Sequence, residues 1–200
     1  ETGILLIYKE KGCESMPLFK ETEPRKQEKI NGIVYDMSPA PNYRHGIING
    51  NIYYKIKNGL KNSLCMAFME NLDFNYHPKE NDDYMRPDLM IICDRKHLKG
   101  GSYSGVPKFI AEILSPSTAM RDKTEKKDAY EQAGVPEYWI VSQQGSVEIY
   151  YLKQGSYKLT ESYILQDDEE EEYYNAQTVI SLREFPNITM TLAEIFENVD

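Results

Sequence analysis

Two short apolar segments of the chain each carry one carboxylate where an apolar side chain would pack better. Asp88 opens the first segment, and Glu112 lies in the middle of the second, at residues 109–114. Both have the length of buried strands and are bounded by proline or glycine. Because side chains alternate along a strand, Glu112 would share its face with Ile110 and Leu114. Such a carboxylate is costly to bury ionised without a cation, so a structural salt bridge or a strand-edge position in water is the alternative to a functional role.

A lysine in the following segment has the spacing of an inward-facing residue. Residues 115–118 supply turn and capping side chains, and Gly134 is typical of a helix end, so we predict one helix between them. Lys126 precedes the apolar side chains of this helix by three, four and seven residues; these are Ala129, Tyr130 and Ala133. Lys126 would therefore share their inward face.

The other charged residues of this helix should point in different directions. Asp122 lies one turn before Lys126 on the same stripe, whereas Lys123 and Lys127 are rotated toward solvent. Together with Arg121, these two lysines could contact the phosphates of a nucleic acid. A second group of basic residues follows the first apolar segment: Arg95, Lys96 and Lys99.

Two carboxylates on neighbouring strands and an inward lysine are the parts of a metal-dependent phosphodiesterase. Carboxylates bind a hard ion such as Mg²⁺, usually beside retained waters and the phosphate of the substrate. The ion lowers the pKa of a bound water and offsets negative charge in the transition state. A nearby ammonium can position the attacking water or neutralise a phosphate oxygen.

The order and spacing of these motifs resemble those of the Uma2 family of restriction-endonuclease-like proteins, within the PD-(D/E)XK nuclease superfamily. The resemblance spans roughly residues 17–198 and rests on the motifs at residues 87–88, 112–118, 122–130 and 134–141. It implies that Asp88 and Glu112 hold Mg²⁺ or Mn²⁺. The usual Glu-X-Lys is broken, because Leu114 stands at the lysine position. In this family the lysine has moved to the next helix, which indicates Lys126 as the third catalytic residue.

The resemblance also suggests secondary candidates around this core. Glu28 matches a family position and would be an extra metal carboxylate or an ordinary acid at the edge of a hairpin. His45 also matches one, and the alternative for it is a core histidine satisfied by a neighbour. Asp122 and Tyr130, which share the inward face of the predicted helix, complete this group.

The resemblance implies an α/β fold with a restriction-endonuclease-like core, in which a mixed central sheet is flanked by helices and joined by additional antiparallel strands. Residues 16–200 would form one domain, and residues 1–15 an N-terminal extension or a non-native remnant. Local patterns predict a hairpin at residues 28–37 around Asn31 and Gly32, and a helix at residues 43–60. They also predict a strand at 137–142, a meander over residues 146–165 and a short helix at 192–197.

Cysteine usage and hydropathy bear on the compartment. The three cysteines, Cys13, Cys65 and Cys93, form no CxxC pair, which predicts free thiols in a reducing cytosol. No segment approaches the ~18 apolar residues of a membrane span, so no membrane association is expected. We therefore expect a cytoplasmic protein.

The net charge of −9 is unusual for a protein that binds nucleic acid. Basic residues nevertheless gather near the expected site, so we expect DNA as the substrate. Cleavage of both strands would favour a homodimer with two facing sites. One alternative is a nuclease fold kept as a non-catalytic binding or regulatory module, which would explain the acidity and the broken Glu-X-Lys. The other is hydrolysis of a small phosphoester by the same residues.

Overall fold

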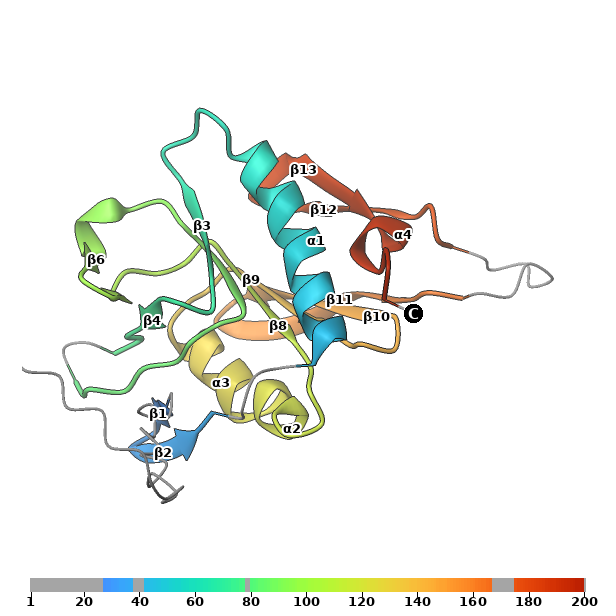
Figure 1. The fold of residues 1–200 in the computed structure, drawn as a ribbon. Coiled ribbons are helices and arrows are strands. Elements are labelled where there is room, and N and C mark those ends of the chain that lie inside the picture. The colour runs from blue at the N-terminus through green and yellow to red at the C-terminus, as the bar shows by residue number, and fades with distance from the viewer. Residues whose placement is uncertain (1–26, 38–41, 78–79, 167–174, 200) are drawn as a thin grey trace, which may run out of the picture.

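The computed structural model of the chain describes residues 27–37, 42–77, 80–166 and 175–199 (Figure 1). A six-stranded sheet in the order β11-β10-β9-β8-β5-β3 forms its centre. In chain order, these strands are β3 (Met66–Met69), β5 (Leu89–Ile92), β8 (Phe109–Ile113), β9 (Glu137–Val141), β10 (Ser146–Lys153) and β11 (Ser156–Ile164). The sheet is mixed, because β8 and β9 run parallel and every other neighbouring pair runs antiparallel.

One face of the sheet is covered by helix α1 (Tyr43–Gly59), which crosses it as a long diagonal element (Figure 1). The isoleucines of α1 recur at every fourth residue and are almost fully buried against the sheet: Ile48, Ile52 and Ile56. A C-terminal hairpin and a short helix pack on the same side: β12 (Val179–Leu182), β13 (Phe185–Thr191) and α4 (Leu192–Ile195).

The opposite face is covered by smaller elements. Helices α2 (Ala119–Lys123) and α3 (Glu125–Gln132) pack there, together with the hairpin of β1 (Gln27–Ile30) and β2 (Ile33–Asp36). A three-stranded sheet and a 3-10 helix complete this side: β4 (Asp73–Phe74), β6 (Leu98–Lys99), β7 (Ser102–Tyr103) and residues Arg95–His97. The first turn of α1 comes down beside α2, so the two sides of the molecule meet at one end of the sheet (Figure 1).

The strand alternation predicted for β8 is confirmed. Phe109, Ala111 and Ile113 belong to the core under α1, whereas Ile110 packs in the core under α3. Glu112 therefore points to the α3 side, and only 2% of its surface is exposed.

The chain's single tryptophan lies in β9 beside this strand. Trp139 is fully buried, pairs in register with Ala111 of β8, and packs its ring edge-on against Phe109 with centroids 5.3 Å apart. Its Nε1 donates a hydrogen bond of 2.7 Å to Glu137, another buried acid.

The hairpin and the long helix follow the predicted pattern. Asn31 and Gly32 form the turn of the first hairpin with φ of 50° and 77°, as a tight turn between twisted strands requires. The predicted strand at 137–142, the meander and the C-terminal helix are also present with small changes of bounds. The hairpin of β12 and β13 was not predicted; Pro186 lies in β13, which pairs only with β12.

The single helix predicted before Gly134 is wrong, because the structure has two helices that meet at Thr124. The backbone of Thr124 leaves the helical region, with φ −123° and ψ −92°. Its side-chain hydroxyl donates to the carbonyl of Met120 at 2.7 Å and stabilises the end of α2. Gly134 ends α3 with φ 81°, as predicted.

The prediction of free thiols is wrong for two of the three cysteines. Cys65 and Cys93 form a disulfide, with an S–S distance of 2.01 Å and Cα atoms 4.0 Å apart. They lie opposite each other because β3 and β5 pair with Met66 facing Ile92. The expectation of a cytoplasmic protein, which relied on free thiols, loses this support. Cys13 lies outside the described residues.

The helices of the described ranges are too short or too polar to cross a bilayer. Residues 1–15 and the acidic run at 168–172 lie outside the part of the chain that the structure describes.

Candidate active site

A cavity of about 420 Å³ lies at the end of the sheet where α1 approaches α2. Its walls come from β1, the first turn of α1, the start of β5, the end of β8 and the segment through α2 to α3. Charged and imidazole side chains dominate its lining: Glu28, His45, Glu70, Arg86, Asp88, Glu112, Arg121, Asp122 and Lys126. The structure thus brings the predicted acids and the predicted lysine into one cavity.

Asp88 is held at the start of β5 by contacts from two other elements. Its Oδ2 accepts a hydrogen bond of 2.7 Å from the backbone N–H of Ile113 in β8. The same oxygen lies 3.1 Å from Nε2 of His45 in the first turn of α1. The carboxylate is therefore held by the neighbouring strand β8 and by helix α1.

Glu112 lies on the neighbouring strand and is bound through both of its oxygens. Its Oε1 accepts hydrogen bonds from the Lys126 ammonium at 3.0 Å and from the Tyr130 hydroxyl at 2.6 Å. Its Oε2 faces the backbone N–H of Asp88 at 3.3 Å. The antiparallel pairing of β5 with β8 therefore places the two predicted metal carboxylates side by side.

Lys126 points inward, as its helical spacing predicted, and is only 4% exposed. Its Nζ lies 3.0 Å from Oε1 of both Glu112 and Glu28. The Oδ1 atom of Asp122 is 3.6 Å away, although a helix break separates the two residues. A single ammonium is thus surrounded by three buried carboxylates.

Burial and charge act against each other in this cluster. Burial raises the pKa of Glu112 well above its usual range, and Lys126 counteracts only part of this rise. Burial also raises the pKa of Asp122, again opposed by Lys126. Burial alone would lower the pKa of Lys126, but the surrounding carboxylates raise it well above the ordinary value, so the ammonium stays charged. The cluster therefore has more acidic groups than cations to balance them.

Glu28 reaches the cavity from the first hairpin and is 2% exposed. Besides contacting Lys126, its Oε1 accepts a hydrogen bond of 2.8 Å from the backbone N–H of Arg86. Its Oε2 lies 3.8 Å from Nη1 of Arg121. The Arg121 guanidinium in turn stacks over the ring of Tyr35, 4.0 Å from its centroid. Glu28 is thus a buried acid at the edge of the hairpin that contacts two cations of the cavity.

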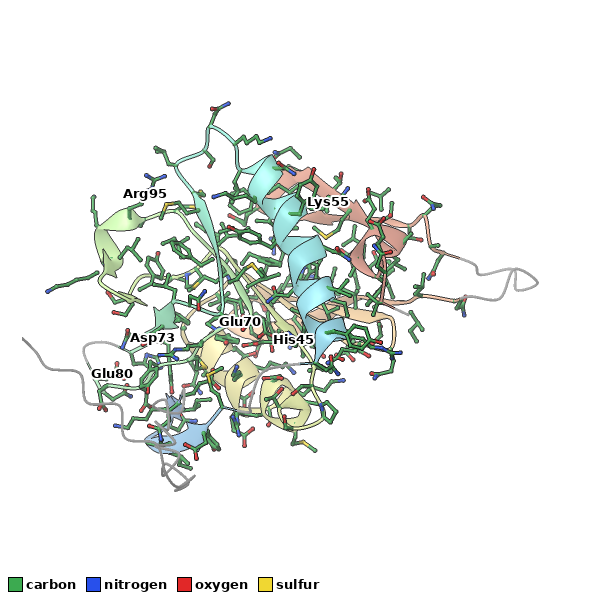
Figure 2. The ribbon with its side chains drawn as sticks, viewed as in Figure 1. His45, Lys55, Glu70, Asp73, Glu80 and Arg95 are labelled. Atoms are coloured by element: carbon green, nitrogen blue, oxygen red, sulfur yellow. A yellow bond between two sulfur atoms is a disulfide. The ribbon has the colours of Figure 1, made fainter. Side chains whose placement is uncertain are left out.

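His45, Glu70 and Asp88 form a second cluster of possible metal ligands. One ligand atom from each of these residues can be chosen so that all three lie within 4.8 Å of one another. His45 and Glu70 lie close together at the foot of α1 (Figure 2). Burial lowers the pKa of His45, but the hydrogen bond and charge of Asp88 outweigh it, and the net pKa is raised. Its Nδ1 is buried without a hydrogen-bond partner among the described residues.

Sequence reasoning missed Glu70. This residue directly follows β3, and its backbone N–H donates to the carbonyl of Asp88 at 3.3 Å. Asn49 of α1 orients the Glu70 side chain through a hydrogen bond of 3.0 Å. An acid that directly follows a short strand gives no local signal of this kind, because its position depends on the register of β3 against β5.

Tyr130 and Asp122 complete the wall on the α3 side. Tyr130 is fully buried, and burial holds the pKa of its phenol well above the usual range, so it remains a donor to Glu112. The backbone carbonyl of Asp122 accepts a hydrogen bond of 2.9 Å from the Tyr138 hydroxyl. Both secondary candidates therefore lie next to the central residues.

The basic residues predicted to contact nucleic acid are divided by the structure. Arg121 lines the cavity. Lys123 pairs with Glu148 at 3.2 Å, and Lys127 lies over the ring of Tyr150 at 4.6 Å; both face β10 rather than the cavity. The more distant basic group, Arg95, Lys96 and Lys99, does not line the cavity either, and Figure 2 shows Arg95 far from His45 and Glu70.

The chain is similar to known proteins in sequence and in fold. The model of the Uma2 family, described as "Putative restriction endonuclease", matches residues 13–193. "Uncharacterized protein slr1290" of Synechocystis sp. (strain ATCC 27184 / PCC 6803 / Kazusa) is 25% identical over 131 residues, covering 66% of this chain and 67% of that protein. The crystal structure of a "putative nuclease belonging to DUF820" from Anabaena variabilis ATCC 29413 aligns with a TM-score of 0.68 and 18% identity, covering 89% of this chain and 95% of that one. The mixed α/β fold is therefore shared with that structure.

Proposed function

The chain belongs to the Uma2 family of restriction-endonuclease-like proteins, and we propose that it is a metal-dependent nuclease that hydrolyses phosphodiester bonds of DNA. One observation carries the proposal. Asp88, Glu112 and Lys126, from three different elements, converge in one cavity that is open to a substrate. Such a constellation of carboxylates and an ammonium suits phosphoryl transfer.

The residues of the cavity fit a divalent cation. Carboxylate oxygens and an imidazole are common ligands of such ions, and the excess of acids over cations favours one more positive charge. The buried Nδ1 of His45 and Oδ1 of Asp122 have no hydrogen-bond partner among the described residues, as expected where a ligand or water completes the site. Asp88 with Glu112, and Asp88 with His45 and Glu70, would hold Mg²⁺ or Mn²⁺.

When bound, the cation would activate water and offset the negative charge that develops on the phosphate. The protein's own groups have separate tasks in this proposal. Asp88 and Glu112 are kept in place by the Ile113 amide and the Tyr130 hydroxyl. Lys126 offers a permanently charged ammonium that orients water or stabilises a phosphate oxygen. Arg121, on the cavity wall, would bind a phosphate of the incoming strand.

The test is cleavage of plasmid and short duplex DNA with Mg²⁺ or Mn²⁺, comparing the wild type with Asp88→Asn. The variant should lose cleavage, and its melting temperature should respond less to Mn²⁺, because a ligand that binds only the folded state stabilises it. Glu148→Gln, which changes an acid outside the cavity, is the matched control and should keep both properties.

The outcomes separate the alternatives. DNA binding in Ca²⁺ with neither cleavage nor a Mn²⁺ response would support a non-catalytic binding module. Turnover of a small phosphoester with no cleavage of DNA would replace the proposed substrate and keep the chemistry. Full activity of Asp88→Asn would refute the assignment of the site.

A further inference from the structure

A second cavity, of about 400 Å³, adjoins the first one. Asn42, Ser115 and Pro116 line both cavities, so the two share a wall formed by the N-cap of α1 and the exit of β8. The second cavity therefore borders the candidate active site at Ser115 and Pro116. The remaining lining comes from the start of α1, from Leu114 and Ala119, and from the turn between β9 and β10.

The start of α1 contributes an aromatic ring and a cation. Tyr43 is exposed, with 63% of the residue accessible to solvent. The Nε of Arg44 donates a hydrogen bond of 3.2 Å to the Tyr43 hydroxyl. Its guanidinium carbon lies 5.9 Å from the centroid of the Tyr43 ring. The pair presents a flat apolar face next to a positive charge.

The turn between β9 and β10 contributes two amides. Gln143 is 7% exposed and donates a hydrogen bond of 2.7 Å to the carbonyl of Leu114, which fixes this turn against the end of β8. The neighbouring Gln144 is exposed, and its Oε1 accepts from the Ser142 hydroxyl at 2.8 Å. The N–H groups of its side-chain amide have no acceptor among the described residues. They can donate to a ligand in the cavity.

The charge of the second cavity is opposite to that of the first. Arg44 is the only charged residue among the described residues that line it, and none of them is an acid. In a chain with a net charge of −9, a surface with a cation and without carboxylates favours an anionic ligand. A phosphate would meet Arg44 there without repulsion from a neighbouring acid.

We propose that the second cavity binds the nucleotide next to the scissile phosphate, a role that rests on the proposed function. The Tyr43 ring stacks on the base, Arg44 contacts the adjoining phosphate, and the Gln144 amide donates to the edge of the base. Stacking on an aromatic ring accepts any base, because every base has a flat π face. Amide donors can discriminate among bases through their edges. The cavity thus binds the substrate tightly through Tyr43 and Arg44 and adds a preference through Gln144.

The experiment measures binding of a labelled single-stranded decanucleotide by anisotropy in Ca²⁺, with Tyr43→Ala, Arg44→Met and Gln144→Ala. Loss of stacking on Tyr43 should weaken binding about 5- to 100-fold. Arg44→Met should lower the dependence of affinity on salt by about 0.7 in the logarithmic slope, since one phosphate contact is lost. Gln144→Ala should mainly change the order of affinities among decanucleotides that each contain a single kind of base. Tyr43→Phe keeps the ring and should bind nearly as well as the wild type.

Lys127→Met is the matched control, because it removes a cation that does not line either cavity. Its binding should stay close to that of the wild type, and circular dichroism should show that every variant is folded. The result is separable from the cleavage assay, because binding in Ca²⁺ needs no turnover. Dependence of binding on Tyr43 and Arg44 without any cleavage would keep this subsite and refute the nuclease. Equal binding by all variants, or no binding by the wild type, would overturn the subsite even if DNA is cleaved.

Discussion

Replacement of Lys126 by methionine is the sharpest test of the site, because an adjacent lysine serves as its control. Methionine keeps most of the length of the side chain but removes the ammonium. In the folded protein this ammonium lies within 3.6 Å of carboxylate oxygens from Glu28, Glu112 and Asp122. Lys127 differs only in its direction, and its ammonium lies over the ring of Tyr150.

The two substitutions should differ strongly in their effect on stability. Removing one partner from a buried ion pair costs about 3–5 kcal/mol, because the remaining charge is left uncompensated. Loss of the contact between Lys127 and Tyr150 should cost about 0.5–1 kcal/mol at this partly exposed position. At neutral pH, Lys126→Met should therefore unfold at a much lower denaturant concentration than Lys127→Met.

The cost at Lys126 should also depend on pH. The pKa of Glu112 and that of Asp122 are raised in the folded state, mainly by burial, and loss of the ammonium raises them further. An acid with a raised folded pKa favours folding below its unfolded pKa, and this contribution is lost as the pH rises through the folded value. The difference in stability between Lys126→Met and the wild type should therefore be largest near pH 8 and shrink toward pH 4.

Urea unfolding at pH 4, 6 and 8, followed by circular dichroism, measures both effects. Cleavage assays on the same samples, at a temperature where all are folded, should show a loss of orders of magnitude for Lys126→Met. Lys127→Met should keep its turnover. Equal destabilisation by the two substitutions, or a cost at Lys126 that does not change with pH, would refute the pairing of this ammonium with buried carboxylates.

Two further predictions concern residues outside the cavity. Burial raises the pKa of Glu137 from 4.5 to about 7, so its contribution to stability is complete below about pH 4.5 and is lost as the pH rises through 7. A rise of this size corresponds to about 3 kcal/mol. Between pH 4 and 8, the free energy of unfolding of Glu137→Gln, measured with urea, should therefore fall by about 3 kcal/mol less than that of the wild type. An equal fall in the two proteins would contradict this prediction. The disulfide closes a loop with a sequence separation of 28 residues, which should restrict the unfolded chain by about 3–4 kcal/mol. The double variant Cys65→Ser/Cys93→Ser should lose this stability in non-reducing buffer, and an unchanged free energy of unfolding would show that the loop contributes little.

The residues that sequence patterns located correctly are those whose positions follow from local geometry. The alternation of β8 predicted that Glu112 lies on the sheet face opposite to Ala111 and Ile113, and the helical spacing predicted that Lys126 points inward. The hairpin turn at Asn31 and Gly32 is also a local property, set by the backbone conformations that these residues tolerate. The break at Thr124 escaped prediction, because a threonine that bonds to the preceding turn looks like any helical residue in sequence.

The features that escaped prediction depend on pairing between distant segments. Glu70 enters the site, and Cys65 meets Cys93, only because β3 and β5 pair in one register. The register of a strand pair is set by the whole sheet, so it cannot be predicted from the sequence of a four-residue strand. The same holds for Lys123, whose partner Glu148 lies on β10, outside the cavity.

The position of Trp139 gives the protein a built-in optical probe. It is the only tryptophan among 200 residues, it is fully buried, and it pairs with Ala111, the residue before Glu112. Its indole faces the α1 side, so a ligand in the candidate active site would not touch it directly. A change in tryptophan emission when cations or oligonucleotides are added would therefore report movement transmitted through β8 and β9. Constant emission during binding would show that the sheet is a rigid platform for the cavity.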